Sequence, residues 1–155
     1  MKAKRILCVV LCATLLVATA IHVRGSTKLT VDNRNPYEQP ILIRATCYTS
    51  DEGAITYSGQ KVRTGIIAGK KDWQGSVALL YTYKMVGGEP IPVELIGIYE
   101  VLDTGAGIDT DGDEKGDSII NGQSIDIYQP TMHQAEEWID EYGDYVMMML
   151  VEGEG

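Results

Sequence analysis

Two aspartates occupy positions where a carboxylate could serve as a general acid or base. Asp103 ends an apolar segment and opens the glycine turn DTGAG (103–107), and Asp126 lies between two isoleucines in SIDIY (124–128). Side chains alternate along a strand, so Asp126 is expected to face away from the side that its neighbours bury. If Asp103 lies close by, the two negative charges would raise the pKa of one carboxyl toward a working pH.

A second group of carboxylates lies between them, in DTDGDEKGD (109–117). Asp109, Asp111 and Asp113 alternate, with Asp117 further on, and this spacing is similar to the start of a calcium loop. The glycine and the glutamate expected at the sixth and twelfth positions of such a loop are missing, and no helix signal flanks it. A solvated acidic insertion is the favoured interpretation, and a calcium site is the alternative.

Cysteine and histidine are too few for other common site chemistry. Cys47 is the one cysteine after residue 12, and His133 falls in the first turn of a predicted helix, where a surface position is expected. We therefore predict no internal disulfide, no zinc site and no cofactor. The net charge of −9 lacks the basic footprint of a nucleic-acid-binding protein.

The N-terminus has the pattern of an export signal. A short basic region precedes the uncharged run ILCVVLCATLLVATA (6–20), which is followed by small residues suited to cleavage. Because the apolar character continues to residue 23, an uncleaved membrane anchor through residues 6–23 is the alternative. We expect a signal peptide or anchor over 1–23, a linker over 24–38 and one domain over 39–153, outside the cytoplasm.

The domain is predicted to be mainly β, with one late helix. Thr131 and Gln134 form a capping box after Pro130, Gly143 is a helix stop, and Trp138 is expected in the core. A glycine at 97 indicates a bulge. The architecture expected is a small closed barrel with the helix at one end. Strands are predicted at 41–48, 55–59, 64–69, 76–84, 92–103, 124–128 and 146–152.

The segment LDTGAGIDT (102–110) resembles the signature of retroviral-type aspartic proteases. That chemistry needs two such carboxylates sharing a proton, so a short chain would have to form a dimer. In those proteases the motif lies near the start of the chain, whereas here it follows about five predicted strands. The protease is therefore the less favoured interpretation.

A longer series of motifs resembles the 3D domain family, which is named for three aspartates. RATCYTSDEGAITYSGQKVRTGIIAG, WQGSVALLY, GIYEVLDTGAG and SIDIYQPT follow one another in the family's order over residues 43–151. The resemblance implies a six-stranded double-psi β-barrel similar to the catalytic core of membrane-bound lytic transglycosylase A.

The resemblance also implies roles for individual residues. Asp126 matches the catalytic acid/base, and Asp103 matches the aspartate of the D-T-G turn, which continues through Thr104 and Gly105. The family's first aspartate has no counterpart in register; Asp72 is the nearest acid, offset by two positions, and Asp103 and Asp126 lie further apart than in the family pattern. The matching polar residues of the substrate groove are Thr46, Tyr48, Thr56, Ser58 and Gly59.

The function implied is that of an exported bacterial enzyme that cuts peptidoglycan glycan strands as a lytic transglycosylase, acting as a monomer. In that reaction the C6 hydroxyl of the sugar attacks its own anomeric carbon, so that one protein carboxyl can serve as acid and then as base. The alternative is a cell-wall barrel that binds glycan without cutting it, since a fold does not fix a function.

Overall fold

The computed structural model describes residues 34–153 of the 155-residue chain. The predicted signal peptide or anchor and most of the predicted linker lie outside the described residues. The last linker residues pack on the domain: the Leu150 amide donates to the Pro36 carbonyl at 2.9 Å, and the Tyr37 hydroxyl hydrogen-bonds the Ser76 hydroxyl. In the part of the chain that the structure describes, no helix is long and apolar enough to cross a membrane.

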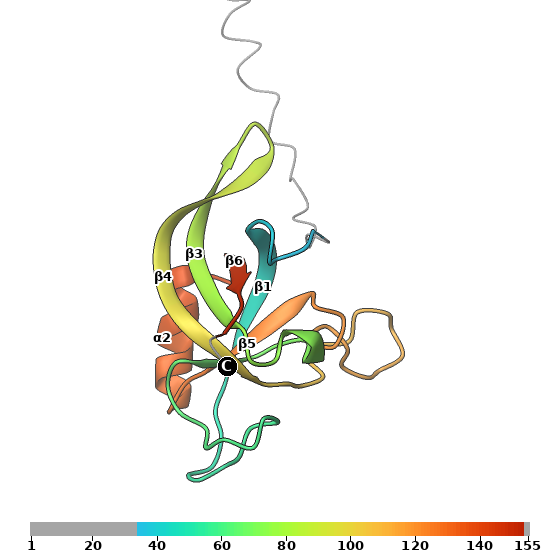
Figure 1. Ribbon diagram of the computed structural model, residues 1–155, viewed down its shortest axis with the longest axis vertical. Coiled ribbons are helices and arrows are strands. Elements are labelled where there is room, and N and C mark those ends of the chain that lie inside the picture. The colour runs from blue at the N-terminus through green and yellow to red at the C-terminus, as the bar shows by residue number, and fades with distance from the viewer. Residues whose placement is uncertain (1–33, 154–155) are drawn as a thin grey trace, which may run out of the picture. The chain divides into compact units, whose positions relative to one another are not determined.

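The described residues form a mainly β structure in which six strands close into a ring (Figure 1). The order around the ring is β1-β5-β2-β4-β3-β6, and β6 pairs with β1 to close it. A short 3-10 helix, η1 (Lys71–Trp73), follows β2, and the α-helix α2 (Met132–Tyr142) precedes the last strand. The strands are β1 (Ile41–Tyr48), β2 (Ile66–Ala68), β3 (Val77–Val86), β4 (Glu89–Asp103), β5 (Ser124–Tyr128) and β6 (Tyr145–Val151).

The pairings divide the ring into two related halves. β1 runs parallel to β5 and β2 runs parallel to β4, whereas the other four pairs are antiparallel. Exchanging β1, β2 and β3 with β4, β5 and β6 leaves this set of pairings unchanged. Both halves therefore contribute one strand to each parallel pair, and both parallel pairs flank the central β5–β2 contact.

The core fills the inside of the ring because alternate residues of each strand point inward. Ile43, Ile67, Leu80, Ile125 and Met148 are among its fully buried members. Trp73 from η1 and Trp138 from α2 join the same cluster, each only 7% exposed. The prediction that Trp138 belongs to the core is confirmed.

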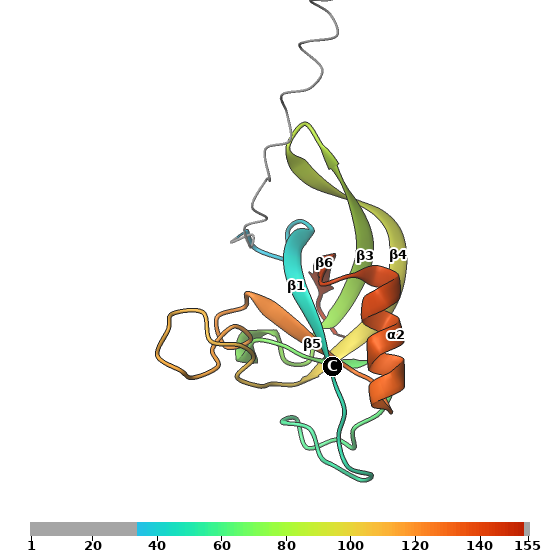
Figure 2. The same ribbon diagram turned by 180° about the vertical axis from the view of Figure 1, so that it is seen from behind.

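The helix begins and ends as its sequence predicts. The Thr131 hydroxyl accepts the Gln134 amide at 3.2 Å, and the Gly143 amide donates to the Ile139 carbonyl at 2.8 Å. Ala135 and Trp138 bury one face of α2, which lies beside the ring as Figure 2 shows from behind. Thr131 caps an otherwise unpaired amide, which typically stabilises a helix by about 1 kcal/mol.

The predicted strand at 55–59 is wrong. This stretch is a loop with one isolated bridge, between Ile55 and Lys61. The Thr56 hydroxyl bonds the Gln60 backbone and the Ser58 hydroxyl, and Gly59 has a φ of +82° that a strand does not adopt. Such local side-chain bonds to the backbone compete with a β ladder, and in this stretch they form in place of one.

The remaining strands agree with prediction apart from their lengths. The strand predicted at 64–69 is limited to β2, and β4 begins before its predicted start. The register of β3 and β4 shifts between Leu80 and Tyr81, opposite Gly97, which confirms the predicted bulge. A Cβ at Gly97 would lie 2.9 Å from the Tyr99 ring, so the ring's position requires glycine there.

Candidate active site

One row of paired residues crosses four neighbouring strands. Thr46 of β1 pairs with Asp126 of β5, which pairs with Ala68 of β2, which pairs with Asp103 of β4. The register of β2 and β4 shifts between Ile67 and Ala68, so the Ala68–Asp103 pair lies at an irregularity of the ladder. Ala68, Asp103 and Asp126 line the same cavity, so the two aspartates lie on one side of the sheet. They are separated by one strand, which places their backbones about 10 Å apart at ordinary strand spacing. The ring thus brings together two acids that are 23 positions apart in the sequence.

The same two acids line one cavity of about 480 Å³. Thr46, Tyr48, Thr104 and Gly105 line it with them, so these four predicted substrate-binding residues gather at one place. Residues that flank the acidic loop complete the lining, namely 106–108 before it and Ile119 after it. This volume is within the range of sites that bind small ligands or one segment of a polymer.

Asp126 has the environment of an acid. It is half-buried between the buried side chains of Ile125 and Ile127, as predicted from their alternation. Burial raises the pKa of its carboxyl, the hydrogen bond from the Thr46 hydroxyl lowers it, and the negative charge of Asp103 raises it further. The net shift of the Asp126 pKa is upward, because removing a carboxylate from water disfavours its charged form. Thr46 Oγ1 donates to Asp126 Oδ1 at 3.0 Å and fixes the side chain.

Asp103 is held by three donors. Its Oδ1 accepts the Thr104 amide at 2.9 Å and the Tyr57 amide at 3.0 Å, and its Oδ2 accepts the Tyr48 hydroxyl at 3.0 Å. Asp103 therefore does cap its own turn, and it also fastens the loop that carries Tyr57 to the end of β4. With these bonds the carboxylate is fixed in position beside the cavity.

Tyr48 and Cys47 keep their protons at this site. Burial and the neighbouring Asp103 charge raise the pKa of the Tyr48 hydroxyl, which remains a neutral donor. Burial and the Asp126 charge raise the pKa of the Cys47 thiol to about 12, so this cysteine is not a thiolate nucleophile. The Tyr48 ring packs edge-on against Tyr128, with 5.5 Å between the ring centroids.

The remaining three predicted groove residues support the site from outside the cavity. Thr56 is buried and bonds Ser58 and Gln60 inside the loop, so its hydroxyl is already engaged. The Ser58 amide donates to the Leu102 carbonyl at 3.0 Å, which attaches the loop to β4. Gly59 provides the positive φ of the turn. Their predicted contact with substrate stays a prediction; the structure shows that they do not line the cavity and that their loop carries the Tyr57 amide bonded to Asp103.

Asp72 lies away from the two acids. Its side chain is 76% exposed and pairs with Lys70 at 3.0 Å, and it does not line the cavity. The neighbouring Trp73 turns inward instead and packs against Gly69 and Gly122. Asp72 is therefore not one of the residues that line the cavity of Asp103 and Asp126.

Sequence reasoning missed two contributors to the site. Gln74 donates from Nε2 to the Asp103 carbonyl at 2.6 Å, and Tyr57 contributes its backbone amide. Gln74 lies in WQGSVALLY, one of the motifs that carry the resemblance, but no role was predicted for its side chain from the sequence. A backbone amide leaves no mark on residue type, so Tyr57 had no signal to find.

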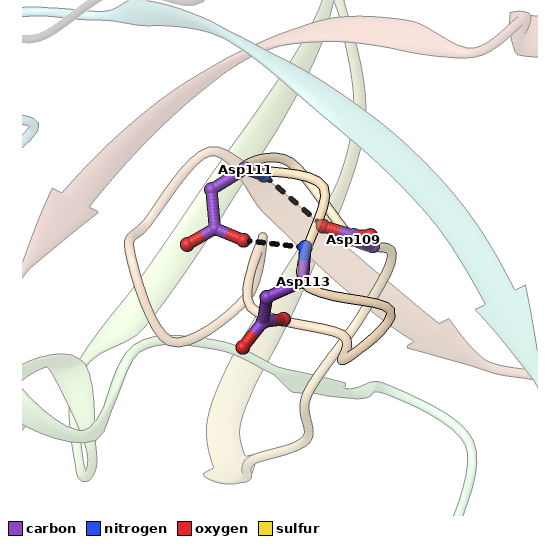
Figure 3. A group of neighbouring side chains, drawn as sticks. All are labelled: Asp109, Asp111 and Asp113. Atoms are coloured by element: carbon purple, nitrogen blue, oxygen red, sulfur yellow. Dashed lines mark hydrogen bonds between the residues drawn. The ribbon is translucent and has the colours of Figure 1, made fainter.

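The acidic loop gathers three of its four aspartates (Figure 3). One oxygen from each of Asp109, Asp111 and Asp113 lies within 4.8 Å of the others, and all three residues are exposed. Asp109 accepts the Gly112 amide at 2.7 Å and the Glu114 amide at 2.9 Å, and these bonds lower its pKa. The carboxylates of the loop accept amides of its own turns. The calcium site stays the alternative interpretation of this loop.

Asp117, the fourth aspartate, takes a different part in the loop. It accepts the Thr110 amide at 2.9 Å and the Asn121 side-chain amide at 2.9 Å. It thus closes the base of the loop and is separate from the group of three.

Comparisons of the chain with family models, with curated proteins and with solved structures found no match.

Proposed function

We propose that the chain is an exported bacterial lytic transglycosylase of the 3D type that cleaves the MurNAc–GlcNAc bond of peptidoglycan glycan strands. The observation that carries the proposal is the pairing row that places Asp103 and Asp126 on one face and in one cavity. Further support comes from the upward shift of the Asp126 pKa, because a general acid must hold its proton near the working pH. The export signal and the order of the sequence motifs agree with a cell-wall substrate.

The finer assignment of the fold, a double-psi β-barrel, is part of the proposal. It is supported by the two parallel pairs, β1–β5 and β2–β4, which the exchange of the two halves of the ring interconverts. Each half then consists of three consecutive strands that interlock with the other half. This is the arrangement that the sequence resemblance implies.

In the proposed mechanism Asp126 acts first as an acid and then as a base. Its proton passes to the glycosidic oxygen as the bond from that oxygen to the anomeric carbon breaks. The C6 hydroxyl of the same sugar attacks the anomeric carbon, and its proton passes to the Asp126 carboxylate. The products are a 1,6-anhydro sugar end and a free hydroxyl on the leaving sugar, and Asp126 recovers its proton.

Asp103 has a supporting role in this mechanism. The anomeric carbon gains positive charge as the bond breaks, and a fixed carboxylate stabilises that charge without reorganising. Tyr48, Tyr57 and Thr104 supply the donors that hold Asp103 in place. No second carboxylate is needed as nucleophile, because the attack is intramolecular.

The test compares two Asp→Asn variants on purified sacculi, with 1,6-anhydro-muropeptides measured by mass spectrometry. Asp126→Asn is expected to lower product release by at least about 100-fold, the contribution typical of a general acid. Asp72→Asn is the matched control, since that acid is exposed and paired with Lys70, and it is expected to retain wild-type release. Equal release by wild type and Asp126→Asn would rule out this catalytic role.

A non-catalytic glycan-binding barrel is the second candidate. The absence of an acid in register with the family's first aspartate favours it, since Ala68 and Lys70 stand in that region. It predicts that sacculi retain the wild-type protein in a pull-down while no anhydro product forms. The retroviral-type protease needs a second copy of the D-T-G turn, whereas here the acid that shares the cavity is Asp126 of the same chain, one strand away.

A further inference from the structure

A second cavity of about 430 Å³ adjoins the first, between β1 and α2. Thr46 and Cys47 line both cavities, so the two meet at these residues of β1. The helix supplies the opposite wall, with Met132, Ala135 and Ile139 as its apolar part. A polymer whose backbone occupies the first cavity can therefore place a side branch in the second.

The charges around the second cavity are unequal. Glu136, Asp140 and Asp144 line it with a single cation, Arg44. Glu136 and Asp140 are four positions apart on α2, where two like charges repel each other. Between residues 34 and 153, Arg44 forms no ion pair, and its buried Nε has no hydrogen-bond partner.

We infer that this second cavity binds the short peptide that branches from the glycan strand, and that it recognises the peptide's side-chain ammonium through Glu136 and Asp140. The inference rests on the proposed function, which places the glycan in the adjoining cavity. A cell-wall peptide carries alanine methyl groups, a glutamyl carboxylate and, at its third residue, an amine. The apolar wall, Arg44 and the acidic pair on α2 match these three groups in turn.

The charge arithmetic favours an ammonium ligand over a neutral one. An added cation removes the repulsion between Glu136 and Asp140 and offsets the excess of three carboxylates over one guanidinium. Each exposed ion pair contributes only modestly to affinity. The peptide is thus expected to contribute selectivity, whereas the glycan contributes most of the binding affinity.

The direct test uses the soluble peptide Nα-acetyl-L-Ala-γ-D-Glu-L-Lys and the full chain, followed by NMR. Resonances of Ala135 and Ile139 are expected to shift on titration, and acetylation of the lysine Nε is expected to weaken binding about fivefold. The Glu136→Gln/Asp140→Asn variant is expected to bind both peptides equally weakly. Glu137→Gln is the control, because Glu137 pairs with His133 and does not line the cavity.

Equal affinity of the wild type for the two peptides, or no shift at Ala135 and Ile139, would overturn the inference. A parallel assay on sacculi and on glycan strands stripped of peptide separates this result from the proposed function. Anhydro products from both substrates without peptide binding would remove the peptide site alone. Peptide binding without any anhydro product would support the peptide site and remove the catalytic proposal.

Discussion

The two aspartates of the site have different surroundings, and these surroundings agree with the different roles proposed for them. Asp103 accepts two backbone amides and one hydroxyl, whereas Asp126 accepts the Thr46 hydroxyl in a half-buried position. Burial is the largest cause of the raised Asp126 pKa, and the charge of Asp103 adds to it. The carboxyl with fewer donors is therefore the one suited to carry a proton.

This difference predicts how stability depends on pH. Because the Asp126 pKa is higher in the folded chain than its ordinary value of 3.8, the folded state binds more protons between those two values. The free energy of unfolding is then expected to fall as pH rises through that window and to stay level above it. Asp126→Asn removes the charge, so the variant is expected to be more stable than the wild type at pH 7.

Urea unfolding of both proteins from pH 3 to pH 8 checks this prediction. The stability advantage of the variant should shrink toward pH 3, where the wild-type carboxyl is protonated. Asp72→Asn serves again as the control, with a flat difference from the wild type. A variant less stable than the wild type at pH 7 would mean that the Asp126 charge is compensated in the folded chain.

At the residue scale, the sequence predicted the positions of the two aspartates better than it predicted their hydrogen-bond partners. The alternation of SIDIY was enough to place Asp126 opposite its isoleucines, and the D-T-G turn was enough to place Asp103 at a strand end. The hydrogen-bond partners could not be predicted from local sequence, because Tyr48 and Asp103 are 55 positions apart in the chain. The Gln74 bond to the Asp103 carbonyl depends on how Trp73 packs, which no local pattern specifies.

Among the elements, the acidic loop is joined to the ring by a narrow neck. Asp117 and Ser118 donate to the Ile108 carbonyl at 2.9 and 3.0 Å, and the Ser118 hydroxyl accepts the Ile108 amide at 2.9 Å. A Cβ at Gly116 would lie 2.2 Å from the Gly107 carbonyl oxygen, so the two sides of the neck are in direct contact. The loop beyond this neck closes upon itself.

Removing the loop beyond the neck is therefore expected to leave the domain folded and active. Replacing residues 109–115 with Asn-Gly keeps Gly116 and joins it to Ile108 by a short turn, which suits two segments already held together by hydrogen bonds. We expect the free energy of unfolding to change by less than about 1 kcal/mol, since shortening an exposed loop has a small entropic effect. Thermal unfolding and the sacculus assay measure the two outcomes.

The same variant also tests whether the tip of the loop affects substrate binding. Residues 106–108 line the cavity and the three gathered aspartates do not, so the tip is not expected to obstruct substrate. A large gain in product release would show that the tip hinders the glycan, and a large loss would show that it contributes to binding. Wild-type release is the expected result.

The elements themselves were mostly predictable, for reasons that also explain the failure at 55–59. β1, β5 and α2 have strong periodicity together with clear start and stop residues, and they were placed correctly. ITYSG has strand-like composition, yet Thr56 and Ser58 bond to each other and to the turn. Composition cannot reveal which of two hydrogen-bonding patterns a threonine will join.

At the scale of the whole molecule, closure of the ring depends on β6. This strand pairs with β1 on one side and β3 on the other, and Met148 lies opposite both Ile41 and Leu80. Met148 is fully buried, whereas its neighbour Met149 faces outward and is only partly buried. The last strand in sequence order, β6, thus closes the ring and completes the core.

Two adjacent substitutions test that dependence. Met148→Ala is expected to lower the free energy of unfolding by about 2–5 kcal/mol, because it leaves a cavity at the closure of the ring. Met149→Ala removes the same atoms from the outer face and is expected to cost less than about 1 kcal/mol. Chemical denaturation of the two variants measures the difference, and equal losses would show that the inside of the ring is not the main core.

The relation between the two halves of the ring has a consequence for how a polymer must enter. Exchanging the halves carries the Thr46–Asp126 pair onto Asp103 and Ala68, so the place that holds an acid on β5 holds a methyl group on β2. The pairing pattern of the strands is the same for both halves, but the acid is present in only one of the two equivalent positions. Under the proposed function, a sugar chain with distinguishable ends is therefore expected to bind in one polarity, because the reversed chain would meet Ala68 at the position equivalent to Asp126.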